Sequence, residues 1–119
     1  MNADSPTGAI RYLPAHPHEG AVDAPDDASA RVIARGNSKI TGTSFNLAVS
    51  FEPSSDGGPA VAQSTFHHFA DYNWDARLGC PSFVDEPPGN GMQTEQAALP
   101  DAHRYAINLA LWLAGKAPH

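Results

Sequence analysis

The clearest pattern along the chain is an alternation of apolar and polar or small residues in the stretch SFNLAVSFE, residues 44–52. Phe45, Leu47, Val49 and Phe51 fall on one side of an extended chain, and the residues between them fall on the other. A period of two is typical of a β-strand with one buried face. We therefore expect a strand over residues 44–52.

Two further apolar runs flank this stretch. The run ARVIARG (30–36) is short, contains β-branched residues and ends in glycine, and the turn residues NSKITGT (37–43) follow it. On the other side, PSSDGG (53–58) predicts a turn, and PAVAQSTFHHF (59–69) predicts a third strand. Consecutive strands are usually neighbours in space. The pattern therefore predicts a hairpin of the first two strands, with the third strand beside the second.

The last segment, LPDAHRYAINLALWLAGKAPH (99–119), has a helical composition. Asp101 is a candidate N-cap, residues 102–114 are good helix formers, and Gly115 can end the helix in a left-handed conformation. Between Tyr105 and Ala114 nearly every side chain is apolar. A helix that is apolar on most sides is buried by more than one neighbour. Three strands do not easily cover it, which predicts a partner chain or a missing part of the domain.

These elements predict a small α/β fold: a mixed sheet of three to four strands with the C-terminal helix packed on one face. The fourth strand would be IRYLP (10–14), which a proline stops. We expect residues 1–9 to be a disordered lead-in and residues 10–119 to form a single domain. Many glycines and prolines predict a long irregular loop at about 70–97.

The composition excludes several classes of protein. The chain has 119 residues and a net charge of −6, and its seven basic residues are scattered, which argues against non-specific nucleic-acid binding. It has no apolar stretch long enough to cross a membrane and no signal-peptide pattern, so we expect a cytoplasmic protein. A single cysteine excludes an internal disulfide and a cysteine-rich zinc module. Common nucleotide-binding and serine-hydrolase motifs are absent.

Two adjacent histidines, His67 and His68, end the third predicted strand, and Asp71 and Asp75 follow them. Adjacent strand residues point to opposite faces, so only one of these histidines can face a given side. Paired with a carboxylate, a histidine can serve as a general base or as half of a metal site. Alternatively, one histidine bonds to the backbone at the strand end and the surrounding aromatic residues are core.

A second candidate is HPHEG, where His16 and His18 flank a proline and Glu19 follows. In an extended segment the two histidines lie on one side, about 7 Å apart. Two histidines and a carboxylate suit a divalent transition metal such as zinc. The alternative is a solvated polar loop.

The two histidine pairs could form one site. Each pair follows an apolar run, residues 10–14 in one case and residues 59–69 in the other. If these runs were parallel neighbouring strands, their ends would meet at one edge of the sheet, as they do in α/β proteins. The predicted metal ligands would then be His16, His18, His67 and His68.

The single cysteine, Cys80, lies in the breaker-rich stretch RLGCPSF, three residues after Arg77. A nucleophilic cysteine needs a base and an electropositive setting. The sequence shows no helix N-terminus here. An ordinary free cysteine is the alternative to a cysteine enzyme.

The stretch GGPAVAQSTFHHFADYNWD and the helix RYAINLALWLAG together resemble the C-terminal end of class I glutamine-amidotransferase-like domains, in particular the trehalose-utilisation-like branch. In that branch a strand reading roughly G-R-V-V/F-x-x-S-x-x-H closes the sheet, and a terminal helix ends in W-L-A/G. Ser64, His67 and His68 match the serine and histidine, and residues 110–115 match the helix end. The preceding NLAVSFE also resembles a strand of such domains, so the likeness spans roughly residues 30–115.

The resemblance implies part of a flavodoxin-like domain without its N-terminal half. The family's nucleophile motif, G-x-C-x-G, is absent from the chain. We therefore expect a non-catalytic domain that associates with itself or with a partner chain supplying the missing half. The alternative is a small metal-dependent hydrolase that activates a bound water through the clustered histidines.

Overall fold

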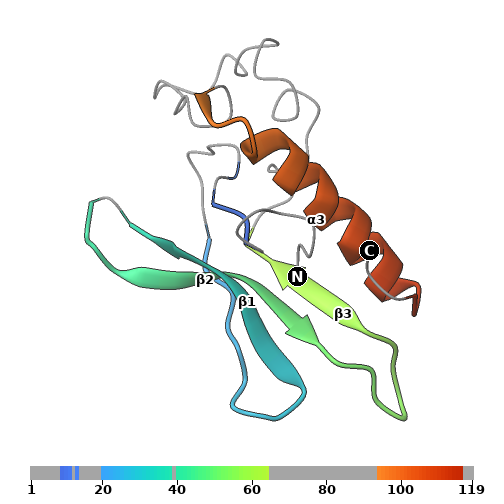
Figure 1. The fold of residues 1–119 in the computed structure, drawn as a ribbon. Coiled ribbons are helices and arrows are strands. Elements are labelled where there is room, and N and C mark those ends of the chain that lie inside the picture. The colour runs from blue at the N-terminus through green and yellow to red at the C-terminus, as the bar shows by residue number, and fades with distance from the viewer. Residues whose placement is uncertain (1–8, 12, 14–19, 39, 65–93, 117–119) are drawn as a thin grey trace, which may run out of the picture. The chain divides into compact units, whose positions relative to one another are not determined.

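The computed structural model describes residues 9–11, 13, 20–38, 40–64 and 94–116. In these residues the chain forms three β-strands followed by a C-terminal helix, which confirms the predicted small α/β class (Figure 1). The chain divides into two compact units, His18–Phe66 and Met1–Pro17 with His67–His119. The strands belong to the first unit and the helix to the second, and each unit is described by itself. The packing of the helix on the sheet stays a prediction.

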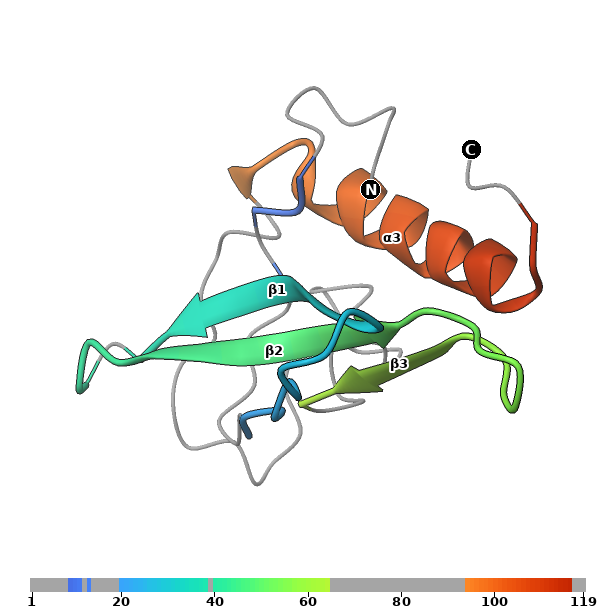
Figure 2. The same cartoon turned by 90° about the horizontal axis from the view of Figure 1, so that it is seen from below.

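The sheet consists of β1 (Ala30–Asn37), β2 (Ser44–Phe51) and β3 (Ala60–Gln63) in the order β1-β2-β3. The central position of β2 is visible in Figure 2. Both pairs are antiparallel, so the predicted hairpin and the predicted neighbour are confirmed. The expectation of a mixed sheet is wrong for the described strands. Short turns join consecutive strands here, and a short turn can only reverse the chain into an antiparallel pair.

Two predicted strands differ in the structure: one is not formed by its described residues, and the other ends earlier. Ile10, Arg11 and Leu13, from the predicted strand at 10–14, are not in a strand. The third strand ends at Gln63, with a bend at Ser64, and the rest of the predicted run (65–69) lies outside the described residues. A strand also needs a partner edge, and none of the described strands pairs with Ile10, Arg11 or Leu13, which accounts for the first difference.

The segment before β1 forms hydrogen bonds with the first half of β2, which β3 is too short to reach. The Val22 amide donates to the Asn46 carbonyl at 3.0 Å, and the Asn46 side-chain amide donates back to the Val22 carbonyl at 3.1 Å. Nearby, the Ser64 amide donates to the Leu47 carbonyl at 2.8 Å. The segment at Val22 thus bonds to the part of β2 that a longer third strand would have paired with.

The core of the sheet unit is centred on β2. Val49 is fully buried, and it lies between Val32 of β1 and Ala62 of β3 in the register. Its neighbours Ala48 and Ser50 are also buried. Because successive strand residues point to opposite faces, β2 is covered on both faces at this point. The Ser50 hydroxyl donates to the Arg31 carbonyl at 3.3 Å, which satisfies a polar group that is costly to bury alone.

An aspartate turn opens β1. The Asp27 carboxylate accepts hydrogen bonds from the Ser29 hydroxyl, from the Ser29 amide at 2.8 Å and from the Ala30 amide at 3.2 Å. These hydrogen bonds hold the pKa of Asp27 below its ordinary value, because they favour the charged carboxylate. The bond from the Ser29 hydroxyl has the largest effect, and the backbone bonds add to it. Local turn chemistry of this kind sets where the strand begins.

A glycine shapes the turn between β1 and β2. The Ser38 amide donates to the Thr43 carbonyl at 2.9 Å, and the Gly42 amide donates to the Ser38 carbonyl at 2.8 Å. Gly42 has a φ of 71°, in the left-handed region that disfavours a Cβ atom.

We expect Gly42→Ala to lower the free energy of unfolding by about 1 kcal/mol, because alanine is strained at this φ. Gly58→Ala is the matched control, since Gly58 has no positive φ and a Cβ there would meet nothing within 4 Å. Denaturant unfolding of both variants measures the difference. Equal stability of the two variants would contradict the role of Gly42.

Candidate interaction surface on the C-terminal helix

The helix α3 covers Ala98–Leu113, so it begins at Ala98 rather than at residue 102. Its N-cap is Ala97, which provides no side-chain cap, and the predicted cap Asp101 lies inside the first turn. The Asp101 amide makes an early helical bond, to the Ala97 carbonyl at 2.9 Å. Pro100 precedes it in the first turn, where a missing N–H costs no helical bond. Pro100 is therefore compatible with a helix that begins before the predicted cap.

As predicted, Gly115 terminates the helix, just after the C-cap Ala114. Gly115 has a φ of 70°, and its amide donates to the Trp112 carbonyl at 2.9 Å. The next amide, that of Lys116, donates to the Leu111 carbonyl at 2.8 Å. This pair of bonds is the Schellman motif, which satisfies carbonyl groups left open at a helix end.

One side of α3 is buried. The buried residues recur at helical spacing, as Ala98, Asp101, Ala102 and Asn108. Two of these four are polar, although buried positions usually favour apolar side chains. Asp101 and Asn108 each take part in an interaction, and they make the buried side of the helix partly polar rather than a purely apolar stripe.

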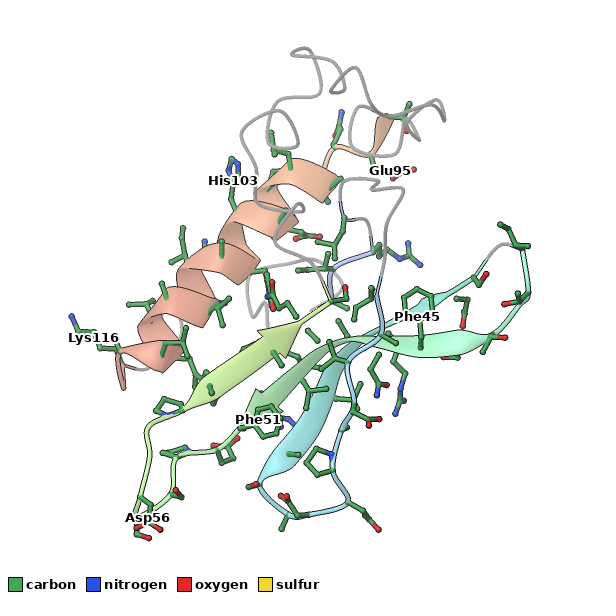
Figure 3. All side chains as sticks on the ribbon, turned by 180° about the vertical axis from the view of Figure 1, so that it is seen from behind. Phe45, Phe51, Asp56, Glu95, His103 and Lys116 are labelled. Atoms are coloured by element: carbon green, nitrogen blue, oxygen red, sulfur yellow. The ribbon has the colours of Figure 1, made fainter. Side chains whose placement is uncertain are left out.

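The opposite side of α3 is exposed and mostly apolar. Ile107 is 51% exposed and Leu113 is 43% exposed, and the small residues Ala110 and Ala114 are exposed as well. We call these four residues the α3 apolar stripe. Towards the start of the helix the exposed His103 follows on the same side, and Lys116 lies just beyond its end (Figure 3). The usual arrangement of a surface helix, with apolar residues inside and polar residues outside, is thus partly reversed.

The predicted histidine site cannot be placed in the same way. His16, His18, His67 and His68 lie outside the described residues, as do Glu19, Asp71, Asp75 and Cys80. One premise for their convergence fails, because Ile10, Arg11 and Leu13 form no strand that could lie beside β3. Within the described ranges no group of three or more His, Cys, Asp or Glu residues could hold a metal. The histidine metal site stays a prediction.

Sequence reasoning missed the polarity of α3. It expected a helix that is apolar on most sides, with Asp101 at its cap, and gave no preferred exposed face. Asp101 and Asn108 are seven residues apart, which is two helical turns, so they fall on one side. That spacing was a signal in the sequence that one side of the helix contains polar residues, about a quarter to a third of a turn away from Ile107.

Comparisons of the chain with protein-family models, curated proteins and solved structures found no match. Separately, the described part of the chain contains no helix that combines the length and the apolar character needed to cross a membrane.

Proposed function

We propose that this chain is a non-catalytic binding domain that associates with a second copy of itself through the α3 apolar stripe. The observation that carries the proposal is the exposure of Ile107 and Leu113 on a helix whose other side buries Asp101 and Asn108. Exposed clusters of large apolar side chains commonly mark interaction sites. Covering this stripe removes apolar surface from water and needs no buried charge.

The arrangement of the stripe favours a second copy as the occupant. Ile107 and Leu113 lie three residues before and three residues after Ala110. In an antiparallel pair of helices centred on Ala110, Ile107 of each copy would face Leu113 of the other. The small side chain of Ala110 would allow the two helices to approach closely. Such a contact is isologous, the commonest arrangement in soluble dimers.

The resemblance to amidotransferase-like domains supports the non-catalytic part of the proposal. The chain lacks the family's G-x-C-x-G motif, so it offers no nucleophile of that kind. Under the same resemblance a partner chain supplying the missing half-domain is the other candidate occupant. Four further statements remain predictions from the sequence alone. They are membership of that family, a cytoplasmic location, a bound divalent metal and the alternative hydrolase function.

The test is sedimentation velocity of the purified chain between about 10 µM and 1 mM, the range in which a small apolar interface associates. We expect a concentration-dependent dimer. The double variant Ile107→Glu/Leu113→Glu should weaken association at least about tenfold, because each dimer would have to bury four carboxylates. Circular dichroism of the variant verifies that the helix is retained.

The matched control is Ile40→Glu, the same substitution at a side chain that is 94% exposed in the sheet unit. It should associate as the unmodified chain does. A chain that stays monomeric throughout the range would contradict the proposal and favour a different partner. A dimer that survives the double substitution would place the interface elsewhere.

A further inference from the structure

The outer edge of β1 is the second exposed feature from which an interaction can be inferred. β1 is an edge strand, because the order is β1-β2-β3 and no described strand pairs with its other side. The Arg31 carbonyl accepts a hydrogen bond from Ser50 of β2, so it faces the sheet. Peptide groups alternate between the two sides of a strand. The N–H and C=O of Val32 therefore point to the outer edge, where a further strand could bond to them.

The side chains on one face of this edge follow a simple pattern. Arg31, Ile33 and Arg35 are all exposed, whereas the residues between them are half-buried. Ile33 is 38% exposed, so it offers apolar surface between two cations. Neither arginine forms an ion pair with another described residue. Two of the seven basic residues of an acidic chain are thus set on one face of an edge strand.

We infer that the outer edge of β1 binds an extended acidic segment of a partner protein as an added strand. In this mode the backbone supplies hydrogen bonds, and alternate side chains supply specificity. The segment would present two carboxylates to Arg31 and Arg35, with an apolar residue between them against Ile33. Alternate positions in an extended strand have the spacing that this requires.

Charge decides against a second copy of this chain at the same edge. If two β1 strands paired antiparallel about Ile33, Arg31 of each copy would face Arg35 of the other. Like charges directly opposite each other destabilise a strand pair. Arginines at an edge thus discourage self-pairing and leave an acidic strand as the complementary occupant.

The register of β1 limits the length of the bound segment. The β1–β2 pairing shifts between Val32 and Ala34 and again between Ala34 and Arg35. An irregularity of this kind bends a strand and interrupts a regular ladder. Backbone bonding should therefore be short and centred on Val32, and the two ionic contacts should contribute much of the selectivity.

The test is fluorescence anisotropy of the full chain with two labelled synthetic peptides containing Glu-Thr-Val-Thr-Glu or Lys-Thr-Val-Thr-Lys. We expect the acidic peptide to bind at least about tenfold more tightly, with an affinity that falls as salt is added. The double variant Arg31→Glu/Arg35→Glu should reverse the preference. A folded far-ultraviolet circular dichroism spectrum of the variant is the control for its integrity.

A third peptide separates strand addition from simple charge attraction. The acidic peptide with N-methyl groups on its central Thr-Val-Thr residues retains both carboxylates but loses the backbone donors that could bond to Val32 in either strand direction. We expect its binding to be weaker than that of the unmodified acidic peptide. Equal binding of the methylated peptide would overturn strand addition. Failure of both unmodified peptides to bind, or an unchanged preference in the double variant, would overturn the site.

Discussion

Replacing Val49 by alanine is expected to lower the free energy of unfolding by about 2–3 kcal/mol, the largest effect we foresee for a conservative substitution. Val49 is fully buried in the central strand, between Val32 and Ala62. The substitution removes two methyl groups from this contact and leaves a cavity that the two flanking strands can only partly close. A small sheet has few other fully buried side chains to compensate for the loss.

Urea unfolding at equilibrium measures this effect. The midpoint should fall while the slope of the free energy against urea concentration is unchanged, since the same surface is exposed on unfolding. Ile40→Ala is the matched control, because that side chain is 94% exposed in the turn between β1 and β2. Its effect should stay within about 0.5 kcal/mol. A loss at Val49 no larger than the loss at Ile40 would contradict the position of the core.

The second large effect is expected at Gly36. This residue pairs with Phe45 across the hairpin, and a Cβ atom on it would lie 2.9 Å from the Phe45 ring and 3.3 Å from a methyl group of Leu47. Both distances are shorter than ordinary contacts. We expect Gly36→Val to destabilise the chain by about 1–3 kcal/mol, because the ring of Phe45 has to move to make room.

A double-mutant cycle tests this cause. In the background Phe45→Leu the aromatic ring is absent, so Gly36→Val should cost at least about 0.5 kcal/mol less than in the unmodified chain. Thermal unfolding of the four proteins gives the coupling. The same cost in both backgrounds would show that the ring is not responsible and would point to the backbone instead.

Several elements followed from local patterns in the sequence. The alternation over residues 44–52 predicted β2 almost to its ends, because only a period of two keeps one face of a strand apolar. The turn residues before β2 predicted its hairpin with β1, and those after it predicted β3 as its other neighbour, since consecutive strands usually lie side by side. Gly115 predicted the end of α3, because glycine enters the left-handed conformation at little cost. Each of these signals depends on residues that lie close together in the sequence.

Other features depended on contacts between distant residues. Residues 10–14 have the composition of a short strand, yet Ile10, Arg11 and Leu13 form none, because a strand also needs a partner edge. The segment at Val22 bonds to Asn46 beyond the end of β3, and no local pattern announced that pairing. The helix α3 begins at Ala98, four residues before the predicted start, and Pro100 permits this because a proline is tolerated in the first turn.

The two proposed surfaces show the same division. The sequence by itself determined that α3 is rich in apolar residues and that β1 is a short run with β-branched residues, and it placed arginines at positions 31 and 35. Only the tertiary structure decided that Ile107 and Leu113 are exposed while Asp101 and Asn108 are buried, and that β1 rather than β2 is an edge. The physical reason is that periodicity shows which residues share a side, whereas burial depends on which distant surfaces cover that side.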